Sequence, residues 1–289
     1  MPELPEVETV RIGLSQYLPK RVFAATLNDN ARSFPNPPAD VDAFVIGASV
    51  TAVRRRAKVL IIDLSSAYSL VIHLKMTGQL VFVSDTARFG AGHPNDSLVG
   101  QLPDKSTRVE FTFTDGSKLF FNDQRKFGWV RLLPTAEVPN IDFMKKVGPE
   151  PLEADFTAKQ FVERLQRRKN TSIKAALLDQ TVIAGVGNIY ADESLWGAKI
   201  HPATRVANVS VQKLHTLFTE LRTVLNLAIE KGGSSDKNYV NAEGKRGSYL
   251  SFARVFRREG QTCPRCGSNI VKLRVAGRGT HICPKEQRF

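Results

Sequence analysis

The chain has 289 residues, of which 42% are hydrophobic and 24% charged, as in a folded globular protein long enough for two domains. Its formal net charge of +13 predicts a polyanionic partner, because a basic protein gains free energy when it releases the counterions condensed on phosphates. The sequence has no apolar run of about 18 residues and no pattern of a secretory leader, and its three cysteines are an odd number, which argues against a disulfide scaffold. We therefore expect a cytoplasmic protein without a membrane partner.

The first residues form the first candidate site. Pro2 follows the initiator methionine, and removal of Met1 would leave a secondary amine flanked by Glu3 and Glu6. An α-amine has a pKa near 8, so a useful share is unprotonated at neutral pH, and condensation with a sugar aldehyde would give an iminium ion. Alternatively, the prolines only start a helix, which we predict over residues 4–18 from apolar residues at helical spacing.

Residues 22–132 have the short alternating patterns of a sheet. We expect strands at 22–27, 50–56, 60–64, 70–74 and 80–83, then a hairpin with its turn at Asp115-Gly116. Residues 90–100 are predicted to be a loop. One helix followed by many strands predicts a β-sandwich with the helix packed on it, which we assign to residues 1–133.

A proline-rich linker is expected at residues 134–151, followed by a helical region at 152–233. The latter contains predicted helices at 156–167 and 172–179 and a long helix that ends at Gly232-Gly233. Between them, Gly185 and Gly187 precede Asn188 at the start of another helix, where free amides suit a phosphate. The alternative is a structural turn in which Asn188 caps that helix.

The remaining residues, 234–289, contain a metal-binding pattern. Cys263 and Cys266 are separated by sixteen residues from Cys283, a spacing typical of two zinc knuckles on a hairpin. The fourth cysteine is absent. Glu286 stands in its register and could complete the site, as could His281 beside Cys283. A hairpin that holds itself by packing and binds no metal is the competing interpretation.

Several of these motifs occur in the order of one known family. They are the opening Met-Pro-Glu-Leu-Pro-Glu-Val-Glu-Thr-Val, the segments 148–152 and 185–190, and the C-terminal knuckle with Gly-Arg-Gly-Thr-His at 277–281. The chain thereby resembles the formamidopyrimidine-DNA glycosylases along essentially its whole length. The resemblance implies an α+β protein with an N-terminal β-sandwich, a helix-two-turn-helix domain and a zinc-finger-like β-hairpin holding one zinc.

The resemblance also implies an activity and a partner. The chain would be a bacterial, monomeric base excision repair enzyme, associated with nucleoid DNA. It would excise 8-oxoguanine and formamidopyrimidines from double-stranded DNA through a Pro2 Schiff base and cleave the abasic site by β,δ-elimination. Glu3 would donate a proton to the sugar or base. Glu6 would be the second carboxylate near the Pro2 amine and would influence its protonation. Lys58 would contact DNA phosphates beside the lesion and assist strand cleavage. The family usually has glycine where this chain has Ala57.

Further residues match the family's DNA contacts. Met76, Arg125 and Phe127 would fill the space left by an extruded nucleotide, although their types alone would place Met76 and Phe127 in the core. The remaining matches, which would hold the backbone around the lesion, are Lys174, Asn188, Arg278 and, in a lesion-recognition loop at 232–249, Tyr239.

Two other functions compete with this one. An enzyme of the endonuclease VIII type would prefer oxidised pyrimidines, but Leu4 and the segment Arg125-Lys126-Phe127 favour the purine enzyme. A non-catalytic DNA-binding relative would have lost activity together with the complete zinc site. The presence of Pro2, Glu3 and Lys58 favours catalysis over mere binding.

Overall fold

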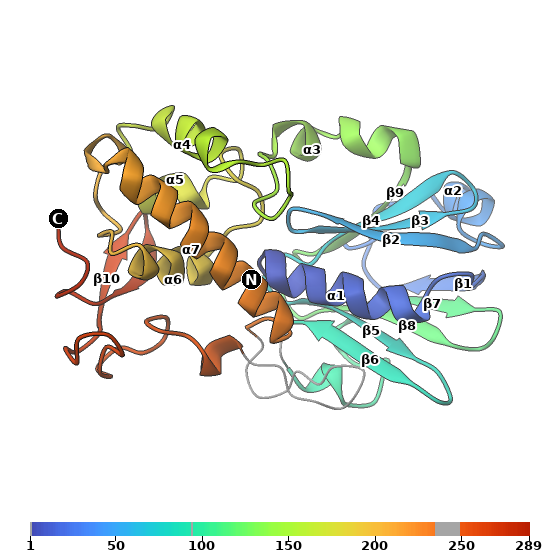
Figure 1. Ribbon diagram of the computed structural model, residues 1–289. Helices are drawn as coiled ribbons and strands as arrows, with labels where there is room; N and C mark the ends of the chain where they lie inside the picture. Colours follow the sequence, from blue (N-terminus) through green and yellow to red (C-terminus); the bar gives the residue numbers. More distant parts are fainter. Residues whose placement is uncertain (1, 94, 235–248) are drawn as a thin grey trace. The chain divides into compact units, whose positions relative to one another are not determined.

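The computed structural model describes residues 2–93, 95–234 and 249–289. The chain forms two compact units, which Figure 1 shows in sequence colours. One unit comprises Met1–Lys145 with Lys231–Ser248, and the other comprises Lys146–Glu230 with Tyr249–Phe289. Each unit therefore combines segments that lie far apart in the sequence.

Two antiparallel sheets form the first unit. One has the order β1-β7-β8-β5-β6 and the other the order β2-β3-β4-β9. Their inward side chains share one hydrophobic core, which confirms the predicted β-sandwich. The strands of this unit are β1 (Phe23–Asn28), β2 (Val50–Arg56), β3 (Val59–Leu64), β4 (Tyr68–His73), β5 (Gly78–Val83), β6 (Arg88–Gly92), β7 (Thr107–Phe113), β8 (Lys118–Asp123) and β9 (Trp129–Pro134).

Strand β6 shows that the loop predicted at residues 90–100 is wrong for its first three residues, 90–92. Its residues pair with β5, with Gly90 opposite Val81. A Cβ atom at Gly90 would lie 3.0 Å from the carbonyl oxygen of Leu98. The glycine therefore allows a close approach within a strand, whereas the composition of the segment predicted a loop.

Helix α1 (Leu4–Tyr17) agrees with the helix predicted over residues 4–18. It packs against β2 and β3 of one sheet and β5 and β6 of the other, as Figure 1 shows. Leu4, Val7, Val10 and Leu14 are fully buried on its inner face. The same sandwich core that stabilises the strands thus fixes the start of this helix. Two short helices of the unit, α2 (Pro38–Phe44) and α3 (Asp142–Lys146), were not predicted, and α3 lies within the expected linker.

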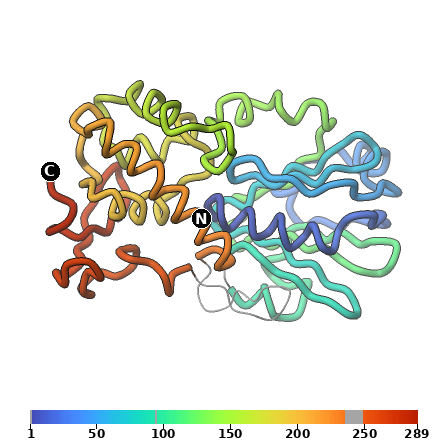
Figure 2. The backbone as a smooth tube through the Cα atoms, in the orientation of Figure 1, coloured from blue at the N-terminus to red at the C-terminus, as the bar shows by residue number. Residues whose placement is uncertain are grey.

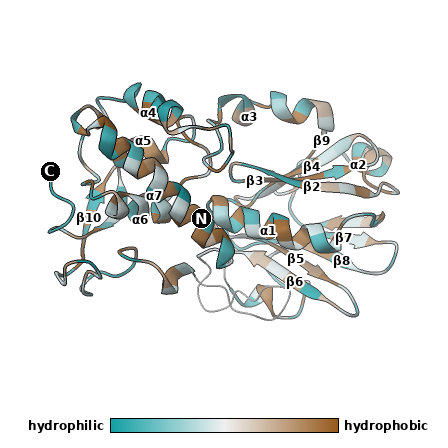
Figure 3. Cartoon of the chain, viewed as in Figure 1, coloured by the Kyte–Doolittle hydropathy of each residue, from teal (hydrophilic) through white to brown (hydrophobic). Residues whose placement is uncertain are grey.

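The second unit is helical, as predicted. Its helices are α4 (Ala158–Gln166), α5 (Ile173–Leu178), α6 (Asn188–Gly197) and α7 (Val211–Glu230), and they share a second core. Side chains at Thr157 and Ser172 cap α4 and α5. In Figure 3, α7 carries bands of hydrophobic and hydrophilic residues, as expected for a helix with one buried face.

A two-stranded hairpin completes this unit. Strands β10 (Val271–Val275) and β11 (Arg278–Ile282) are joined by Ala276 and Gly277, both with positive φ, and β11 packs against α6. Figure 2 traces the hairpin in red near the end of the chain. Within the described ranges, none of the helices has the length and apolar character needed to span a bilayer.

Candidate nucleic-acid interface and metal site

The start of α1 is held by a reciprocal capping box. The backbone N–H of Glu3 donates to Glu6 Oε2 at 2.8 Å, and the Glu3 side chain accepts from the backbone of Glu6. Glu3 and Glu6 are only 3% and 5% exposed, and Pro2 beside them is buried. The other oxygen of Glu6 accepts from the backbone N–H of Ser234 at 2.7 Å. One carboxylate therefore connects the residues next to Pro2 with the chain that follows α7.

Lys58 lies in the tight turn between β2 and β3. It is 5% exposed, so its side chain is buried, unlike that of an ordinary surface lysine. Ala57 has φ +53°, a conformation that favours glycine. Arg55 braces the turn, because its Nε donates to Glu8 Oε2 at 2.9 Å and its Nη1 to the carbonyl of Ala57 at 3.0 Å. The turn that carries Lys58 is thereby attached to α1.

Glu8, which receives Arg55, is a partly buried carboxylate. Burial alone would raise its pKa, but hydrogen bonds from Arg11 and Arg55 outweigh that effect and lower the pKa. The ion pair is therefore formed at neutral pH. It gives the Lys58 turn an anchor on the helix that begins next to Pro2.

His73 is a neighbour of Lys58 that the sequence did not reveal. It pairs with Val59 across β3 and β4, and its Nδ1 accepts from the backbone N–H of Lys75 at 3.0 Å. Burial, with smaller effects from the charges of Lys75 and Lys58, lowers the pKa of His73 to about 3. The imidazole is therefore neutral at physiological pH. No sequence signal marks this residue, since its position depends on the register of two strands.

Met76, Arg125 and Phe127 lie in two turns of the first unit. Met76 is 38% exposed and Phe127 is 56% exposed, so the alternative prediction that both are core residues is wrong. The Arg125 guanidinium carbon lies 5.0 Å from the centre of the Phe127 ring. These side chains form an exposed group of apolar and cationic character, as insertion into a base stack would require.

A buried carboxylate that we did not predict holds both turns. Asp123 is 1% exposed. It accepts a short hydrogen bond from the Thr77 hydroxyl and further bonds from the backbone N–H groups of Arg125 at 3.2 Å and Gly128 at 2.6 Å. The available signal was its place at the start of Asp-Gln-Arg-Lys-Phe-Gly, because aspartate often bonds to the backbone two residues later.

In the second unit, Asn188 links α6 to the hairpin. Gly187 is the N-cap of α6 and Asn188 the first helical residue, so the interpretation of Asn188 as a helix cap is wrong. The Asn188 side chain instead donates from Nδ2 to the carbonyl of Gly279 at 2.9 Å. Arg278, the neighbour of Gly279, is exposed. The structure thus places Asn188 beside the residue that follows Arg278 in β11.

Lys174 differs from its expected position against DNA. Its side chain is 0% exposed, and its ammonium donates to Asp192 Oδ1 at 2.6 Å and to the Thr280 hydroxyl at 2.7 Å. Asp192 is equally buried and also accepts from the backbone N–H of His281 at 2.9 Å. In this geometry Lys174 anchors the hairpin, through Thr280, on Asp192 of α6. Tyr239, the remaining predicted contact, lies outside the described residues.

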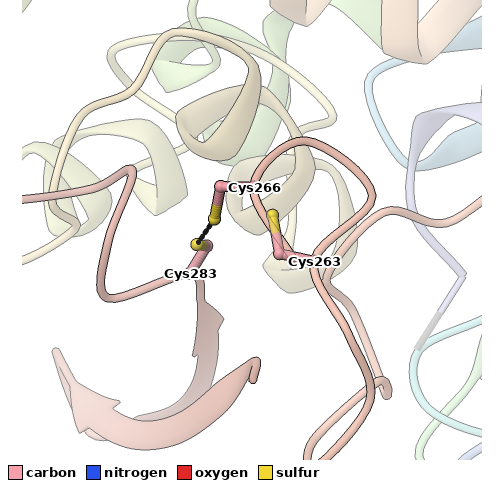
Figure 4. A group of neighbouring side chains, drawn as sticks. All are labelled: Cys263, Cys266 and Cys283. Atoms are coloured by element: carbon pink, nitrogen blue, oxygen red, sulfur yellow. Dashed lines mark hydrogen bonds between the residues drawn. The ribbon is translucent and has the colours of Figure 1, made fainter. Parts of the chain in front are cut away.

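Three cysteines converge at the base of the hairpin. Figure 4 shows Cys263 and Cys266 on one loop and Cys283 opposite them, and their sulfur atoms all lie within 4.8 Å of one another. Hydrogen bonds from Ser268 lower the pKa of Cys266 to about 7, whereas burial raises the pKa of Cys283. Thiolates at this spacing fit zinc, and the three cysteines would hold it.

Neither predicted fourth ligand joins this group among the described residues. The Glu286 carboxylate lies 3.1 Å from Lys199 Nζ, and the His281 ring lies beside Asp192. The structure thus supports the predicted zinc site through three of its proposed ligands. It gives no support for Glu286 or His281 as the fourth.

Comparison with known protein families agrees with this description along the whole chain. Residues 1–130 match the formamidopyrimidine-DNA glycosylase N-terminal domain and residues 147–239 the H2TH domain of the same enzymes. Residues 260–285 match a zinc finger found in FPG and IleRS. These matches confirm the predicted zinc finger, and with it a site for one zinc ion.

Individual relatives give the same result. The chain is 42% identical over 285 residues to a formamidopyrimidine-DNA glycosylase of Chloroflexus aggregans, covering 98% of each protein. It is 40% identical to one of Streptococcus pyogenes serotype M6, covering 100% of this chain and 99% of that protein. Among solved structures, a Lactococcus lactis FPG mutant in complex with Fapy-dG DNA has a TM-score of 0.87 at 33% identity, with 100% of both chains covered. A MutM complex with DNA containing carbocyclic 8-oxo-G has a TM-score of 0.86 at 33% identity, again covering 100% of both chains.

Proposed function

The chain belongs to the formamidopyrimidine-DNA glycosylase family, and we propose that it excises oxidised purines from duplex DNA and then cleaves the strand at the abasic site. The observation that carries this proposal is the position of Pro2, directly before a buried capping box made of two carboxylates. Since its relatives are bacterial proteins, we infer that it acts on nucleoid DNA in a bacterial cytoplasm.

Pro2 is the proposed nucleophile. Once Met1 is removed, its secondary amine attacks C1′ of the damaged nucleotide, the bond between C1′ and the base breaks, and the base leaves with the proton that the amine loses. Glu3 donates a proton to O4′, so the bond between C1′ and O4′ breaks and the sugar ring opens. The iminium that this opening leaves between the proline nitrogen and C1′ carries a fixed positive charge and makes the C2′ protons more acidic. Loss of a C2′ proton expels the 3′-phosphate by β-elimination, and δ-elimination then expels the 5′-phosphate. The capping box limits the motion of the amine, so less entropy is lost when it meets C1′.

The exposed turns of the first unit supply the proposed DNA contacts beside the lesion. An enzyme that acts on a base inside a duplex must extrude the nucleotide and fill the space that it leaves. Met76 and Phe127 offer apolar wedges on turns that Asp123 holds in place. Arg125, next to the Phe127 ring, offers a guanidinium for the orphaned base.

Other residues contact the sugar-phosphate backbone of the DNA and so contribute to binding affinity without sequence preference. Arg278 is exposed at the start of β11, and Asn188 is fixed beside it through the carbonyl of Gly279. Lys58, in the braced turn between β2 and β3, contacts a phosphate next to the lesion. Lys174 keeps the hairpin in place from within.

Borohydride trapping on DNA with an abasic site tests the nucleophile. The processed protein should form a covalent adduct that mass spectrometry assigns to Pro2, and Pro2→Gly, a primary amine, should turn over more slowly. Pro5→Ala removes a proline from the same helical turn and is the matched control, which should react as the wild type does. A crosslink at another residue, or full activity of a protein that retains Met1, would refute the proposed nucleophile.

Substrate preference separates the competing functions. In a competition between duplexes containing 8-oxoguanine and thymine glycol, we expect preferential cleavage of the first. A preference for thymine glycol would support an enzyme of the endonuclease VIII type. Binding without any adduct would support a non-catalytic relative.

A further inference from the structure

The fourth coordination position of the zinc site is the feature that the proposed function leaves open. Three sulfur ligands come from Cys263, Cys266 and Cys283. A structural zinc site normally has four protein ligands, whereas a site with three keeps a position for an exogenous ligand. The fourth ligand therefore decides whether the metal is enclosed or remains reactive.

Glu286 is the residue in the register of the missing cysteine, and two cations hold it. Its Oε2 lies 3.1 Å from Lys199 Nζ and 3.4 Å from Arg265 Nη1. Arg265 is itself fixed, because it lies 3.9 Å from the centre of the Trp196 ring and donates to the Trp196 carbonyl at 3.1 Å. These ion pairs hold the carboxylate on its two cations, and among the described residues it is not grouped with the three sulfurs.

His281 is turned toward α6. Its Nδ1 lies 3.4 Å from Asp192 Oδ2, and its backbone N–H donates to the same oxygen at 2.9 Å. The ring packs on Phe256 with 5.1 Å between ring centres. Since Asp192 also receives Lys174, this histidine belongs to the network that anchors the hairpin.

Gln287 closes the loop around the last cysteine with hydrogen bonds. The backbone N–H of Cys283 donates to Gln287 Oε1 at 3.0 Å, and the backbone N–H of Gln287 donates to the Cys283 carbonyl at 2.9 Å. Gln287 also donates from Nε2 to the carbonyl of Ile200 at 3.0 Å and is 1% exposed. The buried Gln287 thus holds the turn after Cys283 in place through hydrogen bonds, and none of these bonds involves Glu286.

Ser268 is the one described side chain whose oxygen lies between two of the sulfurs. Its Oγ is 3.1 Å from Cys266 Sγ and 3.2 Å from Cys283 Sγ. A neutral hydroxyl is a poor zinc ligand compared with a thiolate, imidazole or carboxylate, but it is a good donor to a thiolate. We therefore assign Ser268 to hydrogen bonding with the sulfurs.

We propose that this chain holds its zinc through the three thiolates of Cys263, Cys266 and Cys283, and that the fourth position takes an exogenous ligand: water, or a small imidazole or thiol. Zinc in this finger is then more exchangeable than in a four-cysteine site. The experiments below use the whole protein and measure metal binding, so they are independent of the proposed glycosylase activity.

Cobalt substitution tests the proposal directly, because Co²⁺ takes the same ligands and its absorption bands report on them. In the wild type, adding imidazole should shift the d–d bands. Glu286→Gln and Ser268→Ala should show the same shift, since neither residue is a ligand. If imidazole shifts the bands of one of these variants but not those of the wild type, the residue replaced in that variant is the fourth ligand and the proposal is wrong. Failure of the wild type to bind cobalt or zinc would also overturn it.

Restoring the missing cysteine gives the matched comparison. Glu286→Cys should abolish the imidazole response and tighten zinc binding by about tenfold or more, measured by competition with a chromophoric chelator. Glu286→Gln should leave zinc affinity within about threefold of the wild type. A large loss of zinc affinity in Glu286→Gln would show that the carboxylate binds the metal, provided that the circular dichroism spectrum of the variant is native. Unchanged affinity together with a retained imidazole response in Glu286→Cys would show that position 286 does not face the metal.

Discussion

Replacing Lys174 with methionine separates the two roles that this lysine could have. If it contacts DNA, its loss weakens binding and leaves the fold intact. If it anchors the hairpin, as its burial indicates, its loss destabilises the second unit. Methionine has a similar length and no charge, so the substitution removes mainly the ammonium.

The structure sets the expected size of the effect. Lys174 and Asp192 both have 0% exposed side chains, and the Nζ to Oδ1 distance is 2.6 Å. Breaking a buried ion pair by removing one partner leaves an uncompensated charge and costs about 3–5 kcal/mol. The double variant Lys174→Met with Asp192→Asn should recover most of this loss. It leaves no charge at either of these two positions, and the asparagine oxygen can still accept from the backbone N–H of His281.

Urea unfolding at saturating zinc measures the loss. Trp196 is 5% exposed in the second unit, so a Trp129→Phe background makes its fluorescence report on that unit. DNA binding at several salt concentrations is measured on the same variant under conditions where it is folded. A stability change below about 1 kcal/mol, together with a salt slope reduced by about one unit, would identify Lys174 as a phosphate contact and refute its role as an anchor.

The remaining predictions concern one residue in each unit. Because the pKa of His73 falls to about 3 in the folded state from 6.5, the neutral imidazole contributes stability above pH 6.5 that is lost as the pH falls toward 3. His73→Asn, which keeps an acceptor for the Lys75 N–H, should flatten this acid dependence in unfolding measurements, and an unchanged pH profile would show that His73 is not its source. Arg278→Ala should weaken binding to all duplexes and reduce the magnitude of the slope of log binding constant against log salt concentration by about one. The control Lys213→Ala, on the exposed face of α7, should leave both unchanged. Equal slopes for the wild type and Arg278→Ala would contradict the phosphate contact.

Local patterns in the sequence determined most of the fold. Alternating residues at 50–56 predicted β2, the Asp115-Gly116 pair predicted the β7–β8 hairpin, and helical spacing after Leu4 predicted α1. The cysteine spacing predicted the metal site. The strands, the hairpin and the helix depend on residues a few positions apart, and the metal site on a fixed spacing of about twenty residues, so all of them can be read along the chain.

Tertiary structure alone decided which side chains are accessible. Met76 and Phe127 looked like core residues and are exposed, while Lys174 was expected to contact DNA and is buried. The partner of Lys174 at Thr280 is 106 positions away in the sequence. Burial and charge pairing depend on such distant contacts, which no local pattern records, and they determine whether a lysine holds the protein together or is free to bind a phosphate.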